Sequence, residues 1–85
     1  MGRDMRTYLK NFREQNKLSQ QNVALKIGLS QQYYNYIEKG VRQKDMSLSV
    51  MERLAKVFNL SLETIIDAEK DYQKSLEELN RSVRN

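Results

Sequence analysis

The chain has 85 residues and contains no cysteine, histidine, proline or tryptophan. This length fits one small domain, which buries only about 60% of its unfolded surface. Without cysteine there is no disulfide framework and no thiolate metal site. Without histidine the usual general base and the commonest metal ligand are missing. The sequence also offers no nucleophile–base pair and no phosphate-binding glycine loop, so we expect no enzyme activity, no cofactor and no bound metal.

Charge is distributed unevenly along the chain, whose formal net charge is +4. Residues 1–45 carry nine basic and four acidic side chains, whereas residues 46–85 carry six basic and seven acidic ones. This asymmetry indicates that the first half meets a polyanion. No apolar run approaches the roughly 18 to 20 residues of a membrane-spanning helix, and no apolar signal segment begins the chain. We expect a cytoplasmic protein with no membrane partner.

Apolar residues recur at spacings of three and four, which predicts an all-α fold. Serines before the periodic stretches serve as N-caps, and Gly28 and Gly40 stand where a helix end needs a left-handed residue. Asn22 departs from a full capping box, which wants Glu or Gln at the third helical position. The five expected helices cover Met5 to Gln15, Gln20 to Ile27, Gln31 to Lys39, Leu48 to Phe58, and the segment after Ser61. The expected inward side chains include Val23, Ala24 and Ile27 of the second helix and Leu48, Met51, Leu54, Ala55 and Phe58 of the fourth.

The segment from Ser19 to Gly40 has the form of a DNA-binding helix-turn-helix, whose second helix enters the major groove. Ala24 is small enough for the helices to cross closely, and Gly28 permits the tight turn. We expect Tyr34 to face the core, because three tyrosines in four positions cannot all point inward when successive residues turn by about 100°. The side chains left facing outward are Gln31, Gln32, Tyr33, Asn35 and Tyr36.

This outward face is rich in amides and phenols and carries no acid on the side expected to face a groove. Glutamine makes a bidentate pair with the adenine edge, and tyrosine donates to a phosphate or packs on a thymine methyl. A solvated face is more commonly filled with lysine and glutamate. The composition of the face therefore favours contact with bases.

At these positions the sequence resembles the phage repressor and Cro-type helix-turn-helix regulators, also called the xenobiotic-response-element type. The resemblance covers roughly residues 9–66 and keeps the order and spacing of the family. Its elements are LKNFR at 9–13, LSQ at 18–20, VA at 23–24, IGLS at 27–30, IEKG at 37–40 and LAKVFNLS at 54–61. It implies a five-helix, lambda-repressor-like DNA-binding domain. Tyrosine at 33, 34 and 36 and the lack of an acid at position 22 depart from the family pattern.

The resemblance also implies roles for individual residues. Gln20 matches a position whose amide grips a backbone phosphate, and Arg13 and Glu38 match a salt bridge that braces the fold. The residues that it implies for reading bases are Gln31, Gln32 and Tyr36, to which the outward face adds Asn35 and Tyr33. The residues expected near phosphates are Gln20, Ser30, Arg42 and Lys44.

The C-terminal segment continues beyond the length that a compact domain needs. Leu62, Ile65 and Ile66 can cover the core. An apolar register then runs through Tyr72, Leu76, Leu79 and Val83, broken only by the acidic Glu69. Three interpretations of this stripe are open. It packs on the same domain, it pairs with a second copy of the chain, or the end of the helix that carries it unfolds. We favour pairing, with residues 1–68 as the DNA-binding domain and residues 69–85 as a dimerising extension.

The sequence thus predicts a transcriptional regulator, a repressor that binds a palindromic operator in double-stranded DNA as a homodimer. No small-molecule ligand domain is evident. The alternative is a protein-interaction module, such as an antitoxin or anti-repressor, whose C-terminal helix binds a different protein.

Overall fold

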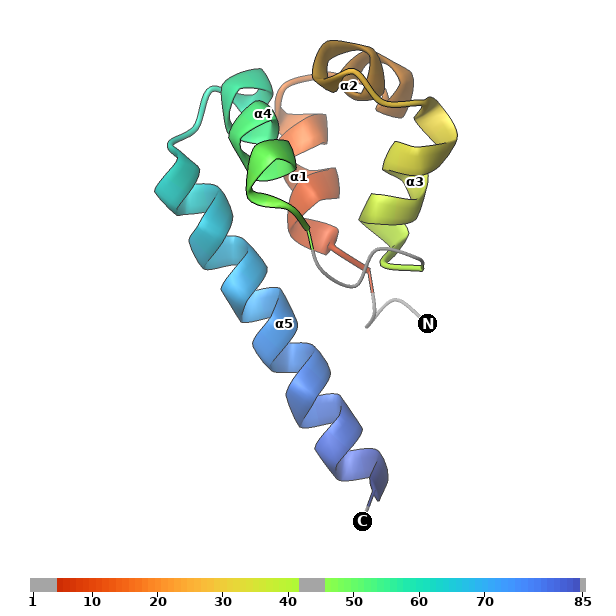
Figure 1. The fold of residues 1–85 in the computed structure, drawn as a ribbon, viewed down its shortest axis with the longest axis vertical. Helices are drawn as coiled ribbons and strands as arrows, with labels where there is room; N and C mark the ends of the chain where they lie inside the picture. Colours follow the sequence, from red (N-terminus) through yellow and green to blue (C-terminus); the bar gives the residue numbers. More distant parts are fainter. Residues whose placement is uncertain (1–4, 42–45, 85) are drawn as a thin grey trace.

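The computed structural model describes residues 5–41 and 46–84, with side chains described up to residue 79. It contains α1 (Thr7–Gln15), α2 (Gln20–Ile27), α3 (Gln31–Lys39), α4 (Leu48–Phe58) and α5 (Leu62–Arg84). The first four helices gather into one body, and α5 packs along α4 before projecting beyond it (Figure 1). No strand occurs within the described ranges, and the predicted all-α fold is confirmed.

Helices α2, α3 and α4 begin and end at the predicted residues because their boundaries are set by local chemistry. The hydroxyl oxygens of Ser19, Ser30 and Ser47 each accept a hydrogen bond from the backbone N–H three residues later. Gly28 ends α2 with φ +77° and Gly40 ends α3 with φ +67°. A side chain rarely adopts this left-handed backbone, so both positions favour glycine.

The start of α2 has a full capping box after all. Asn22 donates its backbone N–H to Ser19 Oγ (3.0 Å), and its side-chain Oδ1 accepts from the Ser19 backbone N–H (3.3 Å). The expectation that Asn22 would leave the box incomplete was wrong, because the shorter amide still reaches the backbone that Glu or Gln would reach.

Helix α1 begins two residues later than predicted. Arg6 is its N-cap residue with a non-helical backbone, and its N–H donates to the Glu38 carbonyl oxygen at the end of α3 (2.7 Å). This long-range bond holds the chain outside the helix at a point where the local apolar spacing would continue it.

The core lies between α1, α2, α3, α4 and the first turns of α5. Its fully buried members include Leu9, Val23, Ile27, Tyr34, Ile37, Leu54 and Ile65. Leu48, predicted to face inward, is 55% exposed. At about 100° per residue it lies some 120° around α4 from Leu54, whereas Val50 lies only about 40° away. Val50 therefore packs against the core in its place.

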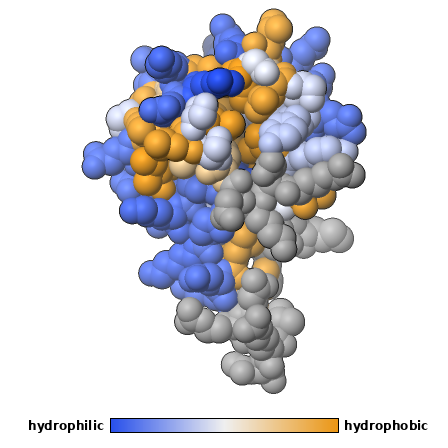
Figure 2. Space-filling view, viewed as in Figure 1, coloured by the Kyte–Doolittle hydropathy of each residue, from blue (hydrophilic) through white to orange (hydrophobic). Residues whose placement is uncertain are grey.

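Helix α5 divides into a packed part and a projecting part. Glu69 and Tyr72 are buried against the N-terminal end of α1, so this part of the stripe covers the same domain. Leu76 and Leu79 are half-buried, and Val83 lies beyond the described side chains. Hydrophobic side chains continue from the body onto the projecting stem (Figure 2). No helix in the described part of the chain has the length and apolarity to cross a bilayer.

Candidate nucleic-acid interface

The first turn of α3 presents polar side chains to solvent. Gln31 and Gln32 are exposed, and Tyr33 is 38% exposed. Ser30 accepts the Tyr33 backbone N–H at Oγ (3.1 Å), which uses an oxygen lone pair and leaves the hydroxyl hydrogen to donate. The end of α3 that leads into a groove in a helix-turn-helix therefore offers amides and hydroxyls to a ligand.

Gln32 and Tyr36 lie one turn apart and are joined, since Gln32 Nε2 donates to the Tyr36 hydroxyl oxygen (2.7 Å). Together with Ser30 and Tyr33 they line a shallow hollow on the surface of α3. The bond fixes the direction of the Gln32 amide. It leaves the side-chain carbonyl oxygen and the second N–H of Gln32 available to bind a base. These two groups are the pair that a bidentate contact with adenine requires.

Tyr34 faces the core, as predicted, and is fully buried. Its hydroxyl oxygen has no partner in hydrogen-bond geometry among the described residues, although Glu38 and Arg13 are near enough for their charges to act on it. Burial and the negative charge of Glu38 raise the pKa of Tyr34 above its usual value.

Asn35 is half-buried, and its Nδ2 donates to Oε1 of Gln20 on α2 (2.9 Å). Gln20 in turn donates from Nε2 to Glu38 Oε1 (3.0 Å). The structure therefore brings a predicted base-reading residue and a predicted phosphate-binding residue together at the junction of the two helices.

The same junction contains the ion pair of Arg13 and Glu38. Arg13 Nε donates to Glu38 Oε2 (2.7 Å), and Arg13 Nη1 donates to the Leu18 carbonyl oxygen (3.1 Å). Hydrogen bonding to Glu38 raises the pKa of Arg13. The carboxylate of Glu38, which is 2% exposed, thus receives both a charged and an amide donor. This network joins α1, α2 and α3.

The first turns of α2, α3 and α4 contain no acidic residue, whereas α5 has Glu63 there. No side-chain carboxylate therefore neutralises the partial positive charge at the start of α2, α3 or α4. An external anion such as a DNA phosphate can interact with this charge. Arg42 and Lys44, expected near phosphates, lie outside the described residues.

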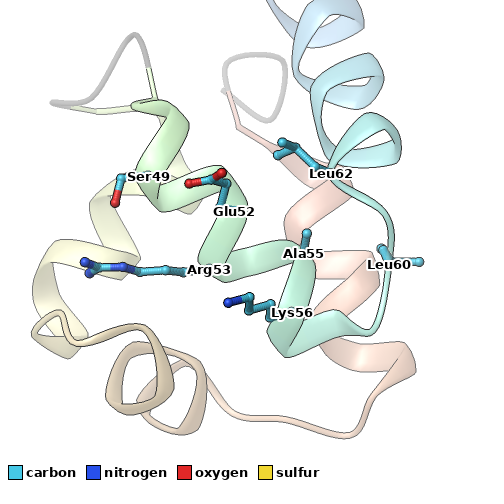
Figure 3. Close-up of a pocket in the computed structure, with 7 residues that line it drawn as sticks. All are labelled: Ser49, Glu52, Arg53, Ala55, Lys56, Leu60 and Leu62. Carbon is cyan, nitrogen blue, oxygen red and sulfur yellow. The ribbon is translucent and has the colours of Figure 1, made fainter.

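A separate hollow lies on α4 and the turn into α5 (Figure 3). Its charged side chains are Glu52, Arg53 and Lys56, and Arg53 Nη1 donates to the Ile27 carbonyl oxygen at the end of α2 (3.0 Å). Arg53 therefore has a structural partner. Within residues 5–41 and 46–79, no group of acidic side chains could hold a metal ion.

The ion pair between Arg6 and Glu69 is not evident from the sequence pattern. Arg6 is completely buried, and its Nε and Nη2 donate to the two oxygens of Glu69, each at 2.9 Å. One signal was available: Glu69 interrupts an apolar register, and a carboxylate on a buried face needs a partner. The partner is 63 residues away in the chain, so no local pattern identifies it.

Comparisons with known proteins agree with this geometry. A family model described as helix-turn-helix matches residues 9–65. An uncharacterized HTH-type transcriptional regulator of Methanocaldococcus jannaschii is 37% identical over 67 residues, which cover 79% of this chain and 98% of the relative. An uncharacterized HTH-type transcriptional regulator of Archaeoglobus fulgidus is 32% identical over 72 residues, which cover 82% and 99% of the two chains. No solved structure gives a significant match.

Proposed function

This chain belongs to the Cro/C1-type helix-turn-helix family of DNA-binding transcriptional regulators, and from that premise we propose that it is a repressor. It binds a palindromic operator as a homodimer and blocks transcription by occupying the site. The observation that carries the proposal is the exposed, acid-free face of α3, where Gln31 is exposed and a hollow is lined by Ser30, Gln32, Tyr33 and Tyr36.

Base reading falls to Gln31, Gln32, Tyr33 and Tyr36 in this proposal. Gln31 is exposed at the start of α3, and Gln32 is oriented by its bond to Tyr36. Each glutamine keeps a donor and an acceptor for a base edge. Asn35 has a different role, because its amide orients Gln20, so it supports the reading face from behind.

Phosphate contacts set the register of α3 in the groove. Gln20 retains one N–H after donating to Glu38, and Ser30 retains its hydroxyl hydrogen. Both stand at helix starts that lack acidic residues, where the helix dipole favours a phosphate. We assign Arg42 and Lys44 to the same phosphate contacts from the sequence alone.

We place the dimer interface on the projecting part of α5. Its half-buried Leu76 and Leu79 continue from a shallow hollow whose lining includes Met5, Tyr8 and Tyr72. A two-fold axis through this region would bring the two hollows and the two leucine pairs together as a self-complementary surface. Binding to a palindromic operator then requires the two copies of α3 to lie about 34 Å apart, which is one turn of DNA.

The test begins with selection of bound duplexes from random DNA. We expect a palindromic consensus with half-sites one helical turn apart, and an affinity that falls steeply as salt increases. The variant Gln31→Ala/Gln32→Ala then loses about 1–3 kcal/mol for each base contact removed, measured on the selected duplex.

The matched control is Asn11→Ala/Gln15→Ala, which removes two exposed amides from α1. It should bind the selected duplex like the unaltered protein. Equal losses in both variants would show that the α3 glutamines do not read bases. Enrichment of no sequence at all, with a different protein bound to α5, would support the antitoxin or anti-repressor alternative.

A further inference from the structure

The end of the recognition helix α3 is capped by a residue from outside it. The last four carbonyl groups of a helix have no partner within the helix. Arg6 supplies donors to two of them: its backbone N–H donates to Glu38 O (2.7 Å), and its Nη1 donates to Ile37 O (2.8 Å). A buried cation at this end also complements the partial negative charge of the helix terminus.

Glu69 on α5 fixes the orientation of that capping group. Two parallel bonds of 2.9 Å join its carboxylate to Nε and Nη2 of Arg6, a bidentate arrangement that defines the plane of the guanidinium. The Arg6 guanidinium also lies 4.7 Å from the centre of the Tyr72 ring. Tyr8 and Gln73 donate to the same carboxylate, at 2.5 and 2.9 Å, so Glu69 itself is held from two sides.

This pair joins two parts of the fold. Helix α3 packs on α2 and α1, whereas α5 packs on α4. Arg6 contacts the end of α3 with two donors and α5 with two more, so a shift of α5 along its axis is transmitted to the end of α3. The cap therefore acts at the far end of the helix whose first turn carries the exposed glutamines.

We propose that Arg6 and Glu69 are positioning residues of the DNA interface, through which α5 sets the angle at which α3 enters the groove. The inference rests on the proposed base-reading function of α3. A buried ion pair adds little net stability over an apolar pair of similar volume, so its effect on position is separable from its effect on folding.

The experiment compares three forms of the full chain: Arg6→Met/Glu69→Leu, Glu69→Gln, and the control Glu78→Gln. The control makes the same change of charge at an exposed site on α5. Urea unfolding measures stability, sedimentation measures the dimer, and binding is measured on the selected duplex and on a scrambled duplex of equal length. Amide hydrogen exchange at Gly40 and Val41, which close the end of α3, reports on the cap.

We expect the apolar double variant to fold with nearly unaltered stability, to lose at least tenfold of its preference for the selected duplex, and to exchange Gly40 and Val41 at least tenfold faster. Glu78→Gln should change none of these. If the double variant fails to fold, Glu69→Gln is measured under conditions where circular dichroism shows it folded, and the same losses are expected.

Unaltered preference and unaltered exchange in a folded variant would overturn the proposal. A loss of preference that follows a loss of the dimer would also overturn it, because the pair would then belong to the dimer interface. If the unaltered protein prefers no duplex, the proposed function fails instead. The exchange at Gly40 and Val41 still decides in that case whether Arg6 and Glu69 hold the end of α3.

Discussion

Asn35 on α3 and Gln20 on α2 are bonded side chain to side chain, with Nδ2 of Asn35 donating to Oε1 of Gln20 (2.9 Å). This bond assigns the two ends of the Gln20 amide, because the nitrogen must then face Glu38, to which it donates at 3.0 Å. The relative placement of the two helices of the motif is thus fixed by this chain of polar side chains as well as by the burial of Ala24 in the core.

The first prediction replaces this donor with an acid. Gln20→Glu puts a second carboxylate beside the buried carboxylate of Glu38, and like charges in contact raise a carboxyl pKa and destabilise the charged form. We expect the free energy of unfolding of the variant to be about 1–3 kcal/mol lower near pH 7. Part of this loss should be recovered as the pH falls, because protonation of one of the two carboxylates removes the repulsion. Urea unfolding at pH 7 and pH 5 measures this.

The control for that prediction is Gln21→Glu, which makes the same change at the next position, where the side chain is exposed in the first turn of α2. There the helix dipole favours the acid by about 0.3–1 kcal/mol. The change in the free energy of unfolding should therefore be a loss in Gln20→Glu and a small gain in Gln21→Glu. A similar loss in both variants would contradict the assigned orientation of Gln20.

Sequence was sufficient wherever a boundary depended on neighbours in the chain. Ser19, Ser30 and Ser47 act on backbone groups three residues away, and Gly28 and Gly40 act on their own turns, so α2, α3 and α4 were predicted to the residue. The outward face of α3 could also be predicted, because it follows from the spacing of residues within one helix.

Positions set by distant contacts could not be predicted. The start of α1 depends on a bond from Arg6 to Glu38, and the burial of Tyr72 depends on its packing under Arg6. Asn35 was assigned to the outward face because helical geometry places it there. The amide of Gln20, on another helix, gives it a partner that spacing does not reveal.

The second prediction concerns the buried hydroxyl of Tyr34, which lacks a hydrogen-bond partner among the described side chains. An unsatisfied buried polar group costs about 1–3 kcal/mol. Tyr34→Phe should therefore leave the protein as stable or up to about 1 kcal/mol more stable, as measured by thermal or urea unfolding. Tyr33→Phe on the exposed surface is the control and should change little. A clear loss of stability in Tyr34→Phe would reveal a partner for the hydroxyl.

The third prediction is a dependence of stability on acid pH through Glu69. Burial alone would raise the pKa of Glu69, but hydrogen bonds from Arg6, Tyr8 and Gln73 outweigh it, so the pKa is lowered. Because the pKa of Glu69 is lower in the folded protein, its carboxylate stabilises the fold at pH values above the pKa of an unfolded glutamate, about 4.3. This stabilisation is lost as the pH falls through the pKa of Glu69 in the folded protein. Urea midpoints from pH 6 down to pH 2 should fall less steeply for Glu69→Gln than for Glu78→Gln. Parallel curves would contradict the assignment.

The fourth prediction addresses the projecting part of α5. Leu76 and Leu79 lie on one face of the helix, and Lys74 lies about 170° around from their midpoint. If this face pairs with a second copy, Leu76→Glu/Leu79→Glu should convert a dimer to a monomer in sedimentation equilibrium. Affinity for a two-half-site duplex should then fall to near that for a single half-site. Lys74→Glu introduces charge on the opposite face and should leave both measurements unaltered, since it lies outside the pairing surface. A protein that sediments as a monomer before substitution, yet still binds both half-sites, would instead mean that two copies associate only through the DNA.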